Sequence, residues 1–431
     1  MKKAFIISVL YVILFSESSF AQNSNSIISK TETERIEKYL ASDELEGRQT
    51  FSKGIEKAAD FISNEFAAVD LGKFKNSNSY LQNFSMIKPK YISLNCVLDN
   101  ITVDPKEVVV VTTQANLAIN EQSNYEIATI QKTENLFGAA YKFLNAHKNY
   151  LVLVDESFAP NFLRLAQFKQ TLSEDQANVI YLLTNKIPAK FSIQATHTIT
   201  QLPLSNVVAL LPGKTLPNEY VIFSGHYDHL GINGKKAVNG DSLFNGANDD
   251  AAGTTAMIML SKYFKQLNNN ARTIVFVAFT AEESGGFGAK YFSKQFDPLS
   301  VKAMFNLEMI GTESKWGKNS AYITGFEKSD MGVILQKNLA GSAFQFYPDP
   351  YPDQNLFYRS DNATLAKLGV PAHTISTSKM DNEPNYHKPS DQFETIDIDN
   401  MTEIIKAIAL SSKTIISGKD SPTRVDTTLL K

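Results

Sequence analysis

The stretch that decides the fold is residues 220–229, YVIFSGHYDH, in which an apolar run ends in histidine and aspartate. A short apolar run bounded by polar residues predicts a buried β-strand. Similar runs occur at residues 206–211, 273–280, 303–309, 321–324 and 371–376, and helical stretches alternate with them at 252–267, 286–295, 331–338 and 401–416. This alternation predicts an α/β fold with a mixed, largely parallel central sheet flanked by helices.

The residues that follow these strands include many possible metal ligands. They are His226, Asp228 and His229 after the first strand, Asp249 and Asp250 before a helix, Glu282 and Glu283 after the strand at 273–280, Glu308 after the next strand, and His387 near the end of the chain. Functional residues of an open α/β sheet collect at the carboxyl ends of its strands. We therefore expect these side chains to share one cleft.

Composition narrows the chemistry. The chain of 431 residues has one cysteine, Cys96, and six histidines, which excludes a disulfide framework, a zinc ribbon and an iron–sulfur cluster. A metal must then be bound by imidazole and carboxylate groups, a ligand set that favours zinc over manganese or cobalt. Lys and Arg total 42 against 45 for Asp and Glu, so the chain offers no strongly basic face and no nucleic-acid partner is predicted.

The first 21 residues have the pattern of a signal peptide. Lys2 and Lys3 precede an apolar run from Ala4 to Phe15, and Ser19-Phe20-Ala21 places small residues at the cleavage positions. The run is too short for a transmembrane helix and no cysteine follows it directly, so no stable membrane anchor is predicted. We expect an exported protein, periplasmic or secreted, with a buried N-terminal helix as the alternative interpretation.

The rest of the chain divides into a discontinuous main domain and an insert. We predict that residues 22–100 and 204–418 form the main domain and that 101–203 form an inserted lobe, because short β-rich runs there lack potential ligands. The lobe is expected to be a lid or a protease-associated-like domain, with a partner-binding lobe as the alternative. Residues 419–431 form a polar tail that is expected to fray.

Taken together, the motifs resemble those of the co-catalytic two-zinc aminopeptidases, a family of zinc peptidases related to glutamate carboxypeptidase and glutaminyl cyclase. The matching segments are GHYDH at 225–229, NGANDDAAG at 245–253, AEESG at 281–285, NLEMIG at 306–311 and YHKPSD at 386–391. LASD at 40–43 and EGR at 46–48 also resemble the exported members. The resemblance covers roughly residues 30–90 and 200–415, and it implies the zinc exopeptidase fold.

The resemblance implies two zinc ions per chain. Asp249 would bridge them, since a carboxylate has one oxygen for each ion. His226 and Glu308 would complete one site, and Glu283 and His387 would complete the other. Each ion would then have three protein ligands and an open position, as catalytic zinc sites do.

The resemblance also assigns the catalytic groups. Glu282 would be the general base, because it adjoins a ligand without being one. Asp228 would orient the imidazole of His226, and Tyr386 would donate a hydrogen bond to the oxyanion of the reaction. In relatives the peptide bond between the two aspartates of the NDD motif, here Asp249–Asp250, is cis.

Other residues receive simpler interpretations. His229 is expected to be structural or to support a ligand, and Ser390 and Asp391 to shape the loop that carries His387. The segment Arg359-Ser360-Asp361 resembles a family loop near the cleft that helps to order it, with direct substrate contact as the alternative. No role is predicted for His147, His197 or His373.

The function implied is an exported metallo-aminopeptidase that acts on peptides. Two alternatives on the same scaffold stay open: a glutaminyl cyclase, which needs one zinc ion, and a carboxypeptidase for acidic dipeptides. The carboxypeptidase is kept open by Glu308, because the aminopeptidases usually place aspartate there. A receptor-like binding protein that has lost its metals is an alternative of another class. Metal content separates the classes: two zinc ions for a peptidase, one for a cyclase and none for a receptor.

Overall fold

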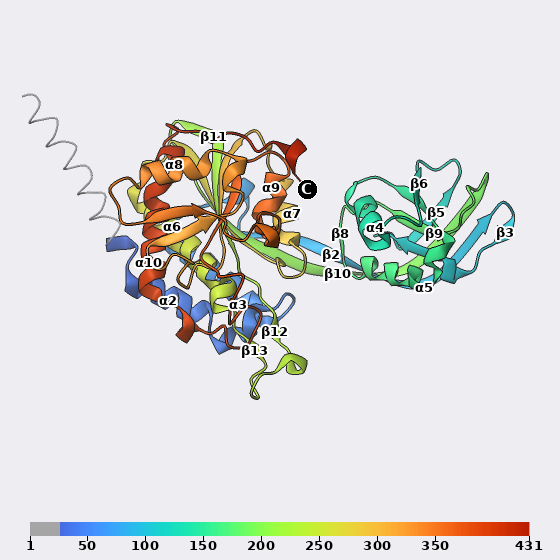
Figure 1. The fold of residues 1–431 in the computed structure, drawn as a ribbon, viewed down its shortest axis with the longest axis horizontal. Helices are drawn as coiled ribbons and strands as arrows, with labels where there is room; N and C mark the ends of the chain where they lie inside the picture. The colour runs from blue at the N-terminus through green and yellow to red at the C-terminus, as the bar shows by residue number, and fades with distance from the viewer. Residues whose placement is uncertain (1–25, 431) are drawn as a thin grey trace, which may run out of the picture. The chain divides into compact units, whose positions relative to one another are not determined.

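The computed structural model of the protein describes residues 26–430, so the predicted signal peptide at 1–21 lies outside the described residues. The chain forms two compact units, one from residues up to Asn83 together with Leu204 onward, the other from Phe84 to Pro203 (Figure 1). We call them the main unit and the lobe. Among the described helices, none combines the length and the apolar character needed to cross a membrane.

The main unit is built on a mixed sheet. Its strands follow the order β17-β16-β18-β15-β11-β14-β10. Their bounds are β17 Gln345–Pro348, β16 Ser320–Ile323, β18 Ala372–Ser376, β15 Val301–Leu307, β11 Leu216–His226, β14 Arg272–Phe279 and β10 Phe191–Leu211. The pairs β11–β14, β11–β15, β15–β18 and β16–β17 are parallel, whereas β10–β14 and β16–β18 are antiparallel. The short β1 (Gly72–Lys73) also pairs with β10. The predicted fold class, a largely parallel mixed sheet flanked by helices, is confirmed.

Helices cover both faces of this sheet because successive strand side chains point to opposite faces. In β11, Val221 and Phe223 belong to one core cluster and Ile222 to the other. The first cluster packs against α2 (Lys30–Leu40), α3 (Lys53–Ala68), α6 (Ala252–Leu267), α8 (Met331–Asn338), α10 (Ile398–Ser411) and α11 (Lys413–Ile416). The second packs against α7 (Phe287–Ser293) and α9 (Asn362–Ala366), on the opposite side of the sheet (Figure 1).

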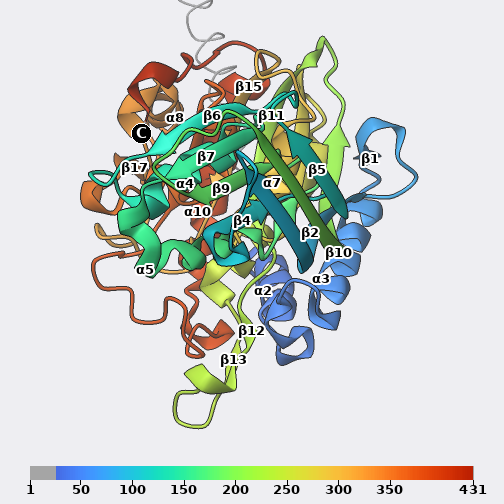
Figure 2. The same cartoon turned by 90° about the vertical axis from the view of Figure 1, so that its right-hand side faces the viewer.

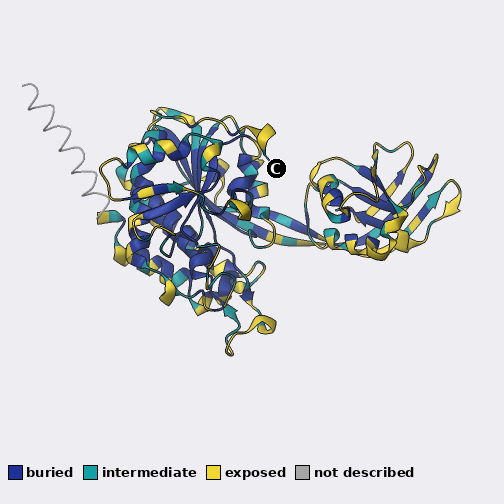
Figure 3. Ribbon diagram, in the orientation of Figure 1, coloured by how far each residue is buried: buried dark blue, intermediate teal, exposed yellow. Residues whose placement is uncertain are grey.

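The lobe has a core of its own. Its four-stranded sheet has the order β4-β9-β7-β6, with β4 Val108–Val111, β9 Val179–Leu183, β7 Tyr150–Val154 and β6 Glu126–Ile130 (Figure 2). One face packs against α4 (Leu136–Asn145) and α5 (Ala159–Phe162). The other packs against residues of β2 (Leu81–Leu98), β5 (Asn116–Asn120) and β10. The short strands β3 (Ile101–Thr102) and β8 (Leu172–Ser173) pair with β2. Buried strands run through the centres of both units (Figure 3).

The lobe begins earlier than the sequence indicates. The prediction placed its first residue at Ile101, whereas the compact unit starts at Phe84; both end at Pro203. The difference arises because β2 is a single strand of 18 residues, most of which belong to the lobe. A boundary inside a continuous strand leaves no turn or polar linker in the sequence that could mark it.

The C-terminal segment is packed, so the expectation that it frays is wrong. Val425 is buried, and its backbone N–H donates to the carbonyl of Gly369 at 3.1 Å. Arg424 donates to the carbonyl of Val301 at 2.8 Å. The polar composition of the tail hides these contacts because they are made largely through backbone groups.

Candidate metal centre

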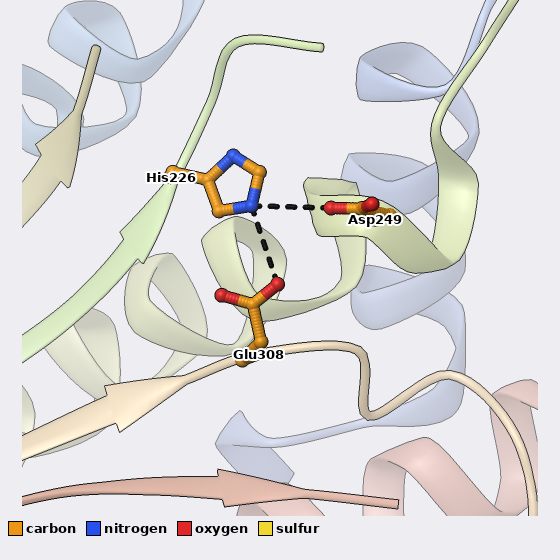
Figure 4. Close-up of side chains that lie close together, drawn as sticks. All are labelled: His226, Asp249 and Glu308. Atoms are coloured by element: carbon orange, nitrogen blue, oxygen red, sulfur yellow. Dashed lines mark hydrogen bonds and ion pairs between the residues drawn. The ribbon is translucent and has the colours of Figure 1, made fainter. Parts of the chain in front are cut away.

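Three predicted ligands meet at the carboxyl ends of β11 and β15. His226 is the last residue of β11, and Glu308 directly follows β15. The imidazole Nε2 of His226 lies 3.1 Å from Asp249 Oδ1 and 3.3 Å from Glu308 Oε1 (Figure 4). Asp249 comes from η7 (Ala247–Ala251), the irregular turn before α6, in which the Asp249–Asp250 peptide is cis.

The tautomer of His226 makes this group suitable for a metal ion. Its Nδ1 lies 3.0 Å from the backbone carbonyl of Asp228, which can only accept a hydrogen bond. In a neutral imidazole the proton is therefore on Nδ1, and the lone pair of Nε2 faces two carboxylate oxygens. A neutral imidazole would thus present a nitrogen lone pair beside two carboxylate oxygens, and imidazole with carboxylates is a ligand set that zinc accepts.

A second group shares Asp249. The Nε2 of His387 lies 3.2 Å from Asp249 Oδ2 and 3.3 Å from Glu283 Oε1. Oδ1 of Asp249 thus faces His226 while Oδ2 faces His387, the arrangement that a bridging carboxylate requires. All five predicted ligands lie together.

His229, which was predicted to be structural or to support a ligand, lies in direct contact with this second group. Its Nδ1 lies 2.9 Å from Glu283 Oε1 but 3.9 Å from Asp249 Oδ2, and the ring is buried. His387 is nearly equidistant from both carboxylates, as a shared ligand would be, whereas His229 is closer to Glu283. His229, Asp249 and Glu283 also form a group that could hold a metal ion. The signal for this contact was available in the sequence, since His229 lies three residues after His226 at the end of the same strand.

Three buried aspartates hold the segments that carry the ligands. Each accepts hydrogen bonds from at least two backbone amides. Asp228 binds the amides of Glu282 (3.0 Å) and Glu283 (3.3 Å), Asp250 those of His226, Gly253 and Met309 (3.0 Å each), and Asp391 those of Asn248 (2.8 Å) and Asp249 (3.0 Å). We call these three residues the aspartate layer. They fix the backbone of every predicted ligand except His387, either at the ligand itself or at the next residue.

Two residues of the aspartate layer make contacts beyond their predicted roles. The Asp228 carboxylate was predicted to orient His226, but its Oδ1 lies 3.7 Å from Nδ1, farther than the Asp228 carbonyl. The main partners of this carboxylate are the two glutamate amides. Asp391, expected only to shape its own loop, holds the amide of Asp249 across 142 residues of sequence. Sequence reasoning assigned no such role to Asp250.

Glu282 and Tyr386 face the pocket beside the two groups. The pocket is lined by residues of both candidate ligand groups and by other side chains; they include Asp249, Glu282, Glu283, Glu308, Tyr386, His387, Tyr322, Thr324, Leu356, Arg359, Ser376, Ser378 and Met380. Burial raises the pKa of the Glu282 carboxyl well above its usual range, and the Asp361 and Glu308 carboxylates raise it further. Burial also raises the pKa of the Tyr386 phenol, as do Asp249 and Glu283, so this hydroxyl keeps its proton and can donate it.

The loop at 359–361 contacts the site through Ser360. Ser360 Oγ donates to Glu308 Oε2 at 2.7 Å, which leaves Oε1 to face His226. Asp361 is buried, and within the described part of the chain neither of its carboxylate oxygens has a hydrogen-bond partner. Burial raises its pKa to about 8. Arg359 also lines the pocket.

The remaining histidines lie outside these groups. His373 is held by the Thr324 carbonyl at 2.9 Å and by Ser329 Oγ at 2.7 Å, a structural arrangement. His147 and His197 belong to the lobe, as does the buried Cys96.

The fold and the paired groups define an α/β protein with a candidate two-metal centre at the carboxyl ends of its central sheet. Residues 206–411 match the model of peptidase family M28.

Two curated relatives match parts of the chain. A probable leucine aminopeptidase of Trichophyton verrucosum is 28% identical over 216 residues, which are 48% of this chain and 56% of the relative. A probable zinc metalloprotease of Pyrenophora teres f. teres is 32% identical over 148 residues, 34% of this chain and 30% of the relative. The chain thus spans about a third to just over half of the length of these relatives.

Solved structures share the fold over most of their length. An aminopeptidase from Aneurinibacillus sp. strain AM-1 superposes with a TM-score of 0.54 at 14% identity, covering 95% of this chain and 98% of that one. A glutaminyl cyclase of Bacteroides thetaiotaomicron gives a TM-score of 0.50 at 10% identity, covering 91% and 99%. At these identities the likeness shows the fold alone.

Proposed function

We propose that the protein is an exported zinc-dependent aminopeptidase that removes N-terminal residues from peptides. The observation that carries this proposal is Asp249, whose two carboxylate oxygens face two different groups of histidine and carboxylate ligands. The match of residues 206–411 to the model of peptidase family M28 and the names of the relatives support zinc and aminopeptidase activity. The pattern of residues 1–21 supports export.

The roles of the residues follow from their positions. Two zinc ions held by His226, Asp249, Glu308, Glu283 and His387 would polarise the scissile carbonyl and lower the pKa of water. Glu282, whose pKa is raised by burial, takes the proton from the attacking water and delivers it to the leaving amine. The phenolic hydroxyl of Tyr386 donates a hydrogen bond to the oxygen of the scissile carbonyl as negative charge develops there.

A second candidate has one specific observation in its favour. Arg359 is the one Lys or Arg side chain among the residues that line the pocket, and a guanidinium there would attract a substrate carboxylate. This favours a carboxypeptidase for acidic dipeptides over a glutaminyl cyclase. The complete second ligand group also disfavours the cyclase, which needs one ion, and a receptor that binds none.

The proposed function is tested by metal content and substrate choice together. We expect the purified protein to bind two zinc ions per chain and the Asp249→Asn variant to lose both, because one carboxylate serves both sites. Aminoacyl-p-nitroanilides should be hydrolysed, N-acetylated versions should not, and a chelator should abolish the activity until zinc is restored.

Each alternative has its own outcome in this experiment. One tightly bound zinc ion with cyclisation of N-terminal glutamine would identify a cyclase. Release of C-terminal glutamate or aspartate from blocked dipeptides would identify the carboxypeptidase. A protein that retains no zinc and turns over none of these substrates would contradict the proposal.

A further inference from the structure

We infer that Arg48, far from the ligands in sequence, is a positioning residue of the metal centre. Its guanidinium ties the segment that carries His226 to the segment that carries Asp249 and supplies positive charge beside the aspartate layer. This inference deepens the proposed function and rests on it, because it concerns the same pair of zinc sites.

The hydrogen bonds of Arg48 all end on backbone carbonyls. Nε donates to Tyr227 at 2.8 Å, Nη1 to Asn245 at 2.6 Å and Nη2 to Gly246 at 2.9 Å. Nη1 also donates to Leu40. Tyr227 directly follows the ligand His226, and Gly246 precedes Asp249 by three residues. One rigid, planar group thus fixes the spacing of two ligand segments.

The backbone of residues 46–48 brings Arg48 to this position. Glu46, Gly47 and Arg48 all have positive φ, at 51°, 68° and 51°. A Cβ on Gly47 would lie 2.2 Å from the carbonyl oxygen of Phe244, so only glycine permits this close approach. A second contact joins the same segments, because Asn245 Nδ2 donates to Asp43 Oδ1 at 2.8 Å.

The positive charge of Arg48 lies close to buried carboxylates beside the metal centre. The side chain is fully buried, and its electrostatic partners are Glu37, Asp391, Asp228 and Asp250, the last three of which form the aspartate layer. Buried carboxylates that accept amide hydrogen bonds still need nearby positive charge when they are ionised. Removal of this cation should therefore loosen the layer and with it the ligand segments.

Arg272 offers a matched control. It is also buried, and it donates to the carbonyls of Ile415 and Asp420 at 2.7 Å each and to Glu219 at 2.7 Å. It therefore braces the C-terminal segment as Arg48 braces the ligand segments, but none of its partners belongs to the metal centre. A loss of stability without an effect on metal is expected from its replacement.

The experiment compares Arg48→Lys with Arg272→Lys in the full-length protein. Zinc affinity is measured by titrating the metal-free proteins against a competing chelator, and thermal unfolding is followed with and without zinc. We expect Arg48→Lys to bind both ions about 10- to 100-fold more weakly, the usual effect of losing a group that supports metal ligands. Excess zinc should restore much of its turnover. Arg272→Lys should unfold at a lower temperature with unchanged zinc affinity.

Asp43→Ala keeps the inference testable if Arg48→Lys does not fold. Asp43 is exposed, so its loss should leave the fold intact and weaken zinc binding in the same direction by a smaller factor. Wild-type affinity in a folded Arg48→Lys protein, or in Asp43→Ala when Arg48→Lys is unfolded, would overturn the inference and leave the proposed function intact. A wild-type protein that binds no zinc would contradict both the inference and the proposed function.

Discussion

Glu282 and Glu283 are adjacent residues whose side chains are expected to do different work. The amides of both are held by Asp228, yet only the Glu283 carboxylate lies near His387 and His229. The two side chains could exchange positions only if the backbone at residues 282 and 283 rotated. The Asp228 hydrogen bonds oppose that rotation, so they would keep the proposed ligand Glu283 and the proposed base Glu282 in their separate positions.

We therefore expect Glu282→Gln to keep its zinc and to lose turnover by about 10²- to 10⁴-fold, the usual contribution of a general base. Glutamine is isosteric with glutamate but cannot accept the proton. Zinc per chain and kcat on an aminoacyl-p-nitroanilide are the two measurements. Loss of zinc from Glu282→Gln, with normal zinc in Glu283→Gln, would show that the two roles are reversed.

The sequence predicted which residues form the site better than it predicted their contacts. Strand ends and motif resemblance selected five candidate ligands that the structure brings together, because chemistry restricts ligands to few residue types; they are His226, Asp249, Glu283, Glu308 and His387. They could not show that Asp391 binds the amide of Asp249 or that Ser360 binds Glu308. Those partners are hydrogen-bonding residues of common types, and their meeting depends on loop paths that carry no periodic signal.

At the scale of elements, α2 packs against α6 with a buried glutamate between them. Glu37 accepts a hydrogen bond from Thr255 Oγ1 at 2.8 Å, and burial raises its pKa to about 8. In the unfolded chain a glutamate titrates near pH 4.3. The folded protein thus holds a proton that the unfolded chain releases between these pH values, so the contribution of Glu37 to stability falls as the pH rises through that range.

Glu37→Gln should remove this loss of stability at high pH. We expect the variant to match the wild type near pH 4.5 and to be more stable by about 2–4 kcal/mol near pH 8, because glutamine stays neutral throughout. Denaturant unfolding at several pH values measures the difference. Glu34→Gln on the same helix is the control for a side chain that is not buried. A stability gap that is independent of pH would contradict the assignment.

The elements themselves were largely predictable where periodicity was strong. The strand at 273–280 and the helix at 252–267 appear as β14, Arg272–Phe279, and α6, Ala252–Leu267. The long strands β2 and β10 were not predicted in full. Of β10, only residues 206–211 were predicted, because that part is almost wholly buried and reads as an apolar run, whereas residues 199–203 of β10 and much of β2 are exposed or half-buried.

At the scale of the whole molecule, the lobe leaves and rejoins the main unit at neighbouring residues. Ser205 Oγ donates to Asn83 Oδ1 at 2.7 Å, so the two ends of the main unit already lie together. A short Gly/Ser linker can therefore replace residues 84–203 at little cost in loop-closure entropy. The separate hydrophobic core of the lobe supports the same expectation.

We expect the shortened protein to bind two zinc ions and to hydrolyse small aminoacyl-p-nitroanilides as the wild type does. If the lobe acts as a lid, kcat/KM on long peptides should change relative to the small substrates. If the ratio of kcat/KM on long peptides to kcat/KM on small substrates is the same before and after the deletion, the lobe does not act as a lid, and a partner-binding role is favoured. Loss of zinc from a folded shortened protein would contradict the independence of the two units.

The aspartate layer also has a consequence for the order of events during folding. Asp391 must reach Asp249 across 142 residues, and Arg48 must reach Gly246 across 198. Contacts so distant along the chain form late, after local helices and strands have assembled. We therefore expect the nascent polypeptide to lack the complete proposed zinc site and to acquire its metal only after the long-range contacts have formed. A chain that crosses a membrane unfolded would reach the far side metal-free, and its activity would depend on the zinc supply of that compartment.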